Sequence, residues 1–210
     1  MKLFATILLL LGLSALPGCA AADTSLTADE AAVARAASVE EAIALQARTQ
    51  GSGIARWRGQ TAGFEPIDAD GIVVMTEPKE GEAVTRHLRK VLADTGYGAY
   101  LRDQHFGHGP DEVVVTAVGE DGYLATVRPD AINYGMDHEA VMKRLAPWRQ
   151  RYGLRLFGAG GDWMQFDITQ PPADWQAFAR EVYDLCPDVV DQGTGCLLYT
   201  SPSPRDATLS

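Results

Sequence analysis

Residues 71–102 read GIVVMTEPKEGEAVTRHLRKVLADTGYGAYLR, and this stretch decides the fold. Residues 72–76 form a short apolar run, which predicts a buried strand. Pro78 stands where a helix can begin and Gly96 where one can end. The apolar positions between them follow helical spacing, at Val84, Leu88, Val91 and Leu92. Residues 97–102 predict a second strand, so the order strand, helix, strand indicates a parallel crossover.

The region that follows predicts two further strands joined by a tight turn. Residues 113–118 form an apolar run that is typical of a strand. The segment at 120–122, Glu-Asp-Gly, has turn composition. We therefore expect residues 123–127 to return beside the first run and complete a hairpin.

A capped helix is predicted after this hairpin. Asp137 is a residue type that caps helix N-termini, and Gly153 can end a helix in the left-handed conformation. Pro147 lies inside the segment and is expected to kink the helix, because proline has no backbone N–H to donate. The face that we expect to be buried carries Val141, Leu145, Trp148 and Tyr152.

The last part of the domain predicts two strands and a helix. Residues 154–157 and 163–168 have strand composition and flank a glycine-rich segment at 158–161. Because a strand follows the glycines, the segment predicts a hairpin turn and not a phosphate-binding loop, which would lead into a helix. The final helix is expected between the proline pair at 171–172 and Pro187. Its apolar face carries Trp175, Phe178, Val182 and Cys186.

Residues 19–70 are predicted to be a tether that leads to an α+β domain at 71–195. The first part is rich in alanine and has helical capping signals, which indicates a helical spacer. Residues 51–70 lose this periodicity and contain several glycines, so we expect a loop with Trp57 and Phe64 as anchors. The predicted class is α+β, with a mixed β-sheet and helices packed on one face, preceded by a helical tether.

The N-terminus has the features of a bacterial lipoprotein signal. An almost wholly apolar run follows Lys2 within residues 1–18, and it is too short to span a bilayer. Residues 16–19, Leu-Pro-Gly-Cys, resemble the lipobox, which implies that Cys19 carries the lipid and anchors the protein to a membrane of the cell envelope. The sequence leaves open which membrane this is. The alternative is an ordinary signal peptide cut near residues 20–22.

The C-terminal segment 196–210 is expected to be foreign to the protein. Residues 196–206 read CLLYTSPSPRD, which resembles a translation of the transposase end and adapter used to prepare sequencing libraries. We therefore treat this segment as read-through. The natural sequence after Gly195 stays open.

Charge and cysteine content narrow the classes of function. The chain has a formal net charge of −10, which disfavours nucleic acid as a partner. With Cys19 lipidated and Cys196 in the foreign segment, Cys186 stands alone and cannot form an internal disulfide. We expect no cofactor. The expected contacts are with the membrane, through the lipid, and with a protein partner.

A second resemblance covers residues 132–195. The residues that carry it are Asn133, Tyr134, Asp137, Trp148, Tyr152, Gly153, Gly158, Ala159, Asp162, Trp163, Pro171, Cys186, Pro187, Asp188, Asp191, Gln192, Gly193, Thr194 and Gly195. This pattern resembles the bacterial family known as domain of unknown function 4253, and residues 71–129 resemble it more loosely. The resemblance implies a fold and a family but no activity.

The best candidate for metal chemistry is the segment between the predicted strands at 97–102 and 113–118. His105 and His108 are three residues apart and Asp111 follows, so the three side chains could hold a divalent metal if further donors lay nearby. The alternative is a glycine-rich connection whose histidines contact water. Cys186 lacks a histidine partner in the sequence, and its place on an apolar face predicts a structural cysteine.

A second set of polar residues could line a binding site. Asp162 and Trp163 follow the glycine-rich segment, and the remaining members of the set follow the last helix. These are Asp188, Asp191 and Gln192, for which helix capping is the alternative. The sequence therefore predicts a lipid-anchored envelope protein with a non-catalytic binding domain. The narrower expectation is an immunity-like role, which rests on analogy with small acidic α+β domains. The alternative is a metal-dependent hydrolase that uses the segment from His105 to Asp111.

Overall fold

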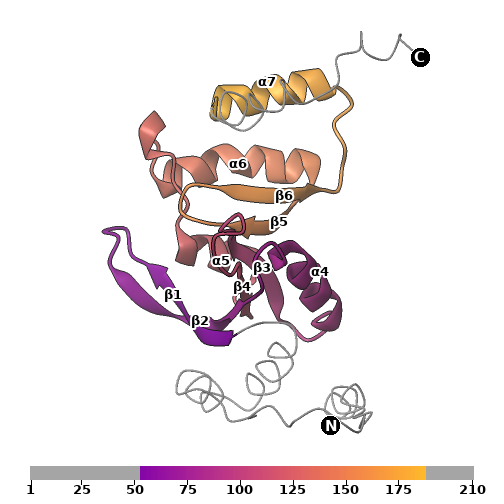
Figure 1. The fold of residues 1–210 in the computed structure, drawn as a ribbon. Coiled ribbons are helices and arrows are strands. Elements are labelled where there is room, and N and C mark those ends of the chain that lie inside the picture. Colours follow the sequence, from indigo (N-terminus) through magenta and orange to yellow (C-terminus); the bar gives the residue numbers. More distant parts are fainter. Residues whose placement is uncertain (1–52, 188–210) are drawn as a thin grey trace, which may run out of the picture. The chain divides into compact units, whose positions relative to one another are not determined.

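The computed structural model describes residues 53–187 (Figure 1). These residues form a mixed six-stranded sheet with the strand order β1-β2-β4-β3-β5-β6, together with four α-helices and a short 3-10 helix. The α+β class is confirmed. The spacer, Cys19, and the segment from residue 188 onward lie outside the described residues. None of the described helices is long and apolar enough to cross a membrane.

The chain divides into two compact units. Within the described residues, the first unit comprises residues 53–128 and Gly158–Gly160, and the second comprises Pro129–Phe157 and residues 161–187.

The first unit begins with a hairpin of two antiparallel strands, β1 (Gly53–Gln60) and β2 (Pro66–Met75). The loop expected over residues 51–70 is therefore wrong for β1 and for the part of β2 up to residue 70, while residues 61–65 connect the two strands. Gly53 and Gly59 lie within β1 instead, whereas Gly63 lies in the connection between the two strands. At Gly59 a Cβ would collide with Thr126. A glycine in a strand often marks such a close approach of another segment. The predicted strand at 72–76 is confirmed as the last part of β2.

The central elements of the first unit follow the predicted order. They are α4 (Gly81–Val91), β3 (Gly98–Asp103) and β4 (Glu112–Thr116). Strand β4 is antiparallel to both β2 and β3, so β2 and β3 run parallel to each other with β4 between them. The predicted crossover is thus present with one strand inserted.

The segment after β4 forms a helix, α5 (Gly119–Val127), where a turn and a returning strand were expected. That expectation was wrong because the apolar residues follow helical spacing. Tyr123, Leu124 and Val127 are buried, and the positions i, i+1 and i+4 share one side of a helix. Arg128 ends the helix in the left-handed conformation, with φ of 53°.

The two helices of the first unit cover opposite faces of the sheet. Tyr100 and Leu101 are neighbours in β3, so their side chains point to opposite faces. The ring of Tyr100 stacks on Tyr123 of α5, with ring centroids 4.6 Å apart. Leu101 contacts the first turn of α4, where its Cδ1 lies 2.8 Å from the position of a Cβ on Gly81. The helical layer is therefore not confined to one face.

A stack of three aromatic rings fills the α5 side of this core. Trp57 of β1 stacks on Tyr123 with ring centroids 5.3 Å apart. The ring of Tyr123 also stacks on Tyr100. Trp57 and Tyr123 are fully buried. Burial of such large side chains is a main source of stability, at about 1.5–3 kcal/mol for a phenylalanine-sized group. Within the described residues, Trp57 Nε1 is the buried side-chain polar atom without a hydrogen-bond partner.

The second unit contains the 3-10 helix η1 (Ile132–Tyr134), α6 (His138–Tyr152), most of β5 (Leu154–Ala159), β6 (Met164–Ile168) and α7 (Trp175–Leu185). The predicted caps of α6 are confirmed. Asp137 accepts a hydrogen bond from the Ala140 amide at 2.9 Å, and Gly153 ends the helix with φ of 55°. The helix continues through Pro147.

The strands predicted on both sides of the glycine-rich segment are also confirmed, although β5 extends to Ala159. The face of β6 that we expected to be buried is only half-buried. Met164, Phe166 and Ile168 all keep partial exposure. The reason is that β6 is the last strand in the sheet order, and an edge strand has a neighbour on one side alone.

Candidate functional site

The connection between β3 and β4, residues 104–111, is held in place by one buried carboxylate. Asp111 is 1% exposed. Its Oδ2 accepts a hydrogen bond from the Gly81 amide at 3.0 Å, and its Oδ1 accepts one from the His105 amide at 3.1 Å. Its main-chain carbonyl accepts a further bond from the Thr76 amide at 2.9 Å. Asp111 therefore joins the end of β2 and the start of α4 to the connection between β3 and β4. We call this connection the Phe106 loop.

The position of this carboxylate is electrostatically favourable. Gly81 is the first residue of α4, and the first amides of a helix have no partner within the helix. A negative charge at this end is also stabilised by the helix dipole. Asp111 thus satisfies a helix end from a position thirty residues away in the sequence, which no local capping pattern could predict.

The two histidines of the predicted metal site do not gather around Asp111. His105 Nδ1 faces Asp103, with 3.7 Å between Nδ1 and Oδ1. His108 is exposed, and its amide donates to the His105 carbonyl at 2.8 Å. Over residues 53–187, no group of three or more His, Cys, Asp or Glu side chains is placed to hold a metal ion. The geometry therefore gives no support to the predicted metal site.

The Phe106 loop instead displays an aromatic side chain that the sequence did not single out. Phe106 is 79% exposed, the largest exposed fraction among the large apolar side chains described. Its backbone is in the left-handed region with φ of 51°, and Gly107 follows with φ of 89°. Such a conformation costs a bulky residue about 1–3 kcal/mol and persists where the surrounding structure enforces it. The glycines at 107 and 109 were the available sequence signal for this unusual backbone.

A lysine from the neighbouring connection lies across the Phe106 loop. Lys79 also has a left-handed backbone, with φ of 71°. Its side chain covers Gly107, where a Cβ would lie 2.6 Å from Lys79 Cε and 3.4 Å from Nζ. The ammonium group is therefore held beside the residue that follows Phe106.

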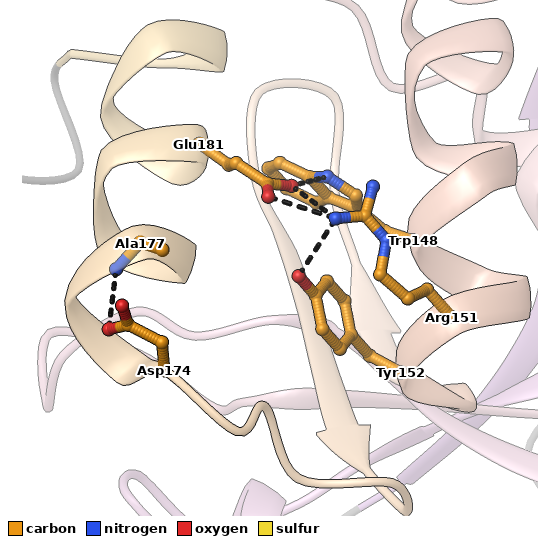
Figure 2. Close-up of polar contacts among 6 residues, drawn as sticks. All are labelled: Trp148, Arg151, Tyr152, Asp174, Ala177 and Glu181. Atoms are coloured by element: carbon orange, nitrogen blue, oxygen red, sulfur yellow. Dashed lines mark hydrogen bonds and ion pairs between the residues drawn. The ribbon is translucent and has the colours of Figure 1, made fainter.

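A second group of polar contacts joins α6 and α7 within the second unit (Figure 2). The Glu181 carboxylate accepts a hydrogen bond from Trp148 Nε1 at 2.9 Å. It also accepts from Arg151 Nη1 at 2.9 and 3.2 Å, and the same nitrogen donates to the Tyr152 hydroxyl at 3.1 Å. Desolvation alone would lower the pKa of the Arg151 guanidinium, but the charge of Glu181 and the contact with Tyr152 outweigh it and raise that pKa.

Aromatic rings complete this contact between the two helices. The ring of Phe178 in α7 lies 5.6 Å from Trp148, 4.8 Å from Tyr152 and 6.0 Å from Trp175, measured between centroids. No residue of α7 is fully buried. Asp174 caps the helix by accepting from the amides of Gln176 and Ala177. Glu181 and Asp174 therefore position α7, and both are already occupied by partners within the fold.

The buried hydroxyl of Tyr123 in the first unit also holds elements of the fold in place. Tyr123 Oη donates to the Ala159 carbonyl at 2.8 Å and lies 3.3 Å from the Leu101 carbonyl. Burial raises the pKa of Tyr123 well above its ordinary value. The side chain thus stays protonated and links Ala159 to α5 within the first unit.

Two of the five predicted binding residues lie within the described structure. Asp162 is exposed and Trp163 is half-buried, and both lie in the short connection from β5 to β6. Asp188, Asp191 and Gln192 lie outside the described residues. Cys186 is a free, half-buried cysteine at the end of α7.

The glycine-rich segment has a packing role at its first residue. Gly158 belongs to β5 and pairs with Leu101 of β3. A Cβ at this position would collide with the Leu101 carbonyl. Because the segment lies at the end of one strand and leads into another, the structure agrees with the predicted connection between strands.

These features define an α+β domain whose described polar groups chiefly hold its own elements in place. Residues 113–203 match the family described as Domain of unknown function (DUF4253), so the resemblance predicted from residues 132–195 is confirmed for this part of the chain. The match includes residues 196–203, and the assignment of that segment to an adapter stays a prediction. No curated protein matches the chain. No solved structure matches it either.

Proposed function

We propose that the chain is a lipid-anchored protein of the bacterial envelope whose α+β domain binds a protein partner and catalyses no reaction. The proposal that the domain catalyses no reaction rests on the hydrogen bonds of the Asp111 carboxylate. The segment with the best set of metal ligands in the sequence places both oxygens of its carboxylate on main-chain amides. A ligand set of two histidines alone is incomplete for a catalytic metal site, which commonly has three protein ligands.

The exposed apolar side chains support partner binding. Large apolar residues that are at least 40% exposed occur in both units, and such side chains are typical anchors of protein interfaces. They are Phe64, Ile67 and Phe106 in the first unit and Ile132, Tyr134, Trp175 and Tyr183 in the second. Within this class, an immunity-like role against a toxin is the narrower proposal, and it rests on analogy with other small acidic α+β domains.

Lipid attachment rests on residues 16–19 and is tested at Cys19. Cells that express the full-length chain would be grown with a radiolabelled fatty acid and fractionated. We expect the label to enter the wild-type protein, which sediments with membranes. In Cys19→Ala we expect no label, because the chain can no longer be converted to the lipidated form. A labelled Cys19→Ala chain, or an unlabelled wild-type chain, would overturn the anchor.

Partner binding is tested on membranes from cells of the source bacterium that express the full-length chain. After mild detergent extraction and purification, we expect one other protein at a fixed molar ratio to the chain. The complex should survive gel filtration, and its mass should equal the sum of the two proteins. A chain that elutes alone, or with many proteins at low and variable ratios, would count against the proposal.

A further inference from the structure

We propose that the turn formed by residues 130–137, which we call the Tyr134 turn, is a docking surface for a basic segment of a partner protein. The inference rests on the proposed function and adds the surface and the kind of partner. Apolar atoms of the partner would cover Ile132 and Tyr134, and its Lys or Arg side chains would pair with Asp130 and Asp137. Every residue of this turn belongs to the second unit.

The turn is closed by its own main chain. Ala131 and Met136 form an isolated antiparallel bridge, in which the amide of each residue donates to the carbonyl of the other, at 2.9 and 3.2 Å. Inside the bridge, the Tyr134 amide donates to the Ala131 carbonyl at 2.8 Å, and the Gly135 amide donates to the Ile132 carbonyl at 3.0 Å. A surface on such an ordered turn loses little conformational freedom when it binds, and this preorganisation favours affinity.

The closed turn exposes two large side chains with apolar surface. Ile132 is 66% exposed and Tyr134 is 40% exposed. Contact with a partner would remove this surface from water, which is favourable by about 25 cal/mol per Å² of apolar area. Tyrosine is also enriched among the residues that dominate binding energy at interfaces, and the face of its ring attracts the cations of Lys and Arg.

Two acidic residues stand at the base of the turn, one on each of its chain segments. Asp130 and Asp137 directly flank the main-chain bridge. One residue further out, His138 Nδ1 contacts the Pro129 carbonyl at 3.1 Å, which keeps the two segments together. The two acidic residues are therefore neighbours, and like charges at facing positions of paired segments are unfavourable. A cation from a partner would relieve this repulsion.

Each of these carboxylates has one oxygen left for a partner. Asp130 Oδ1 accepts a hydrogen bond from the Ile132 amide at 3.2 Å, which places the charge directly beside an exposed apolar residue. Asp137 Oδ1 accepts one from the Ala140 amide at 2.9 Å. Within the part of the chain that the structure describes, neither residue forms an ion pair, and neither Oδ2 atom accepts a hydrogen bond.

The charges around the turn favour a basic partner. Residues 129–142 contain three carboxylates and no lysine or arginine. The Gly161 carbonyl accepts a hydrogen bond from the Asp130 amide at 3.0 Å. The exposed Asp162, which follows Gly161, therefore brings a further carboxylate close to the base of the turn.

The cations that are nearest along the chain leave this charge in place. Arg128 ends α5 in the first unit, and it forms no ion pair with Asp130. Lys143 lies in the second turn of α6, and no ion pair joins it to Asp137 in the described structure. The local charge thus has the same sign as the formal net charge of the chain, −10, and both attract a basic segment.

The same charges disfavour other occupants of the turn. An anionic bilayer and a nucleic acid would be repelled by the turn and by the whole molecule. Over residues 53–187, no group of three or more His, Cys, Asp or Glu side chains is placed to hold a metal ion. A protein segment that carries Lys or Arg beside apolar residues matches both the charge and the exposed apolar surface.

The test uses a phage-displayed library of random dodecapeptides, selected on the full-length chain in detergent micelles. We expect the selected peptides to combine Lys or Arg with apolar residues. Their affinities would then be measured by isothermal titration for the wild-type chain and for Ile132→Ala, Asp130→Asn and Asp137→Asn. Asparagine also forms this kind of turn and caps helices as well as aspartate does, so the two Asn variants remove charge and keep the fold.

The affinity should fall about tenfold in Ile132→Ala and about threefold in each Asn variant. Added salt should weaken binding to the wild-type chain more than binding to the Asn variants, because salt screens exposed charges. The matched controls are Ile67→Ala, which alters an exposed isoleucine of β2, and Asp174→Asn, which alters the exposed cap of α7. Both controls should bind the peptides as the wild-type chain does.

Three results would overturn the surface. They are the selection of acidic peptides or of none, undiminished binding by Ile132→Ala, and an equal loss in Asp174→Asn, which would show a general attraction to an acidic chain. Circular dichroism and thermal unfolding of each variant separate loss of the surface from loss of the fold.

Failure of this surface can be told apart from failure of the proposed function. The co-purification from the source bacterium would be repeated with a chain that carries Ile132→Ala and Asp137→Asn together. We expect the partner to be lost from this chain. A partner that stays bound would reject the Tyr134 turn and leave partner binding intact, whereas a wild-type chain that purifies alone would reject the proposed function itself.

Discussion

Asp111 joins three segments of the chain through one carboxylate and one carbonyl, and it illustrates what residue types alone can predict. The sequence places it near His105 and His108, which suggested a metal site. The partners of the carboxylate are instead the amides of Gly81 and His105. No sequence spacing reveals a contact with Gly81, because that contact exists only after α4 and the Phe106 loop have packed together. The exposure of Phe106 was equally invisible, since it depends on the course of the loop.

We expect Asp111→Asn to destabilise the domain by about 1.5–3 kcal/mol. The substitution removes a charge from the start of α4 and turns one acceptor into a donor that faces an amide. Urea unfolding followed by circular dichroism would measure the change in the free energy of unfolding. The matched control is Asp162→Asn, which alters an exposed residue and should change stability by less than about 0.5 kcal/mol. An equal effect of the two substitutions would contradict the role of Asp111.

Tyr123 leads to a prediction about pH. Burial raises its pKa from the ordinary value of 10.0, so the unfolded chain loses this proton at a lower pH than the folded chain. The folded state then holds more protons than the unfolded state above pH 10, and stability falls as the pH rises through that range. In Tyr123→Phe this component of the slope should vanish, and the lost hydrogen bond should cost about 1–2 kcal/mol at neutral pH.

The control for this prediction is Tyr183→Phe, which alters a tyrosine that is 43% exposed. Urea unfolding at a series of pH values between neutral and alkaline would give both slopes. If Tyr123→Phe and Tyr183→Phe reduced the alkaline slope equally, the burial of the Tyr123 hydroxyl would not be the cause.

Elements with strong local signals were predicted well, and elements defined by distant contacts were not. Helix α6 has its capping residue Asp137 and its terminal Gly153 in the sequence, and α4 has regular apolar spacing. Strand β1 was missed because its glycines suggested a loop, while its burial depends on Trp57 stacking against α5. Helix α5 was missed because its few apolar residues fit either a strand or a helix until the position of Tyr123 is known.

The docking of α7 on α6 gives a prediction at the scale of elements. Glu181→Gln would keep an acceptor for Trp148 but lose the charge that pairs with Arg151. Because Arg151 is 53% exposed and Glu181 is 35% exposed, solvent weakens the pair, and we expect a cost of about 0.5–1 kcal/mol. Hydrogen exchange should become faster in α7 and stay unchanged in α4.

The control is Asp184→Asn, which alters an exposed carboxylate on the same helix and should leave exchange in α7 unchanged. A uniform increase in exchange over both units after Glu181→Gln would mean that this residue affects global stability and not the docking of α7.

At the scale of the whole molecule, the α+β class and the family match of residues 113–203 could be predicted from the sequence, whereas the strand order could not. The parallel pairing of β3 with β5 runs through Leu101 and Gly158, which are far apart in the sequence. The insertion of β4 between β2 and β3 also depends on pairings that no local pattern specifies. Contacts between such distant segments therefore become visible only in the folded chain.

Gly158→Ala should disturb this pairing. The added Cβ would collide with the Leu101 carbonyl, and neither backbone segment can move without losing strand pairing. We expect a loss of about 1–3 kcal/mol, measured as a lower midpoint of thermal unfolding. Gly161→Ala is the matched control, because a Cβ there meets no atom within 4 Å. Equal midpoints for the two variants would show that the close approach at Gly158 is absent.

The central claim is that the domain binds a partner and holds no catalytic metal. Isothermal titration of the metal-free full-length chain with Zn²⁺ tests it most directly, alongside His105→Ala, His108→Ala and the exposed control His87→Ala. We predict weak binding with no defined stoichiometry and the same titration curve for all four proteins. One tightly bound zinc ion per chain, lost in His105→Ala and His108→Ala but retained in His87→Ala, would contradict the account and favour a metal-dependent hydrolase.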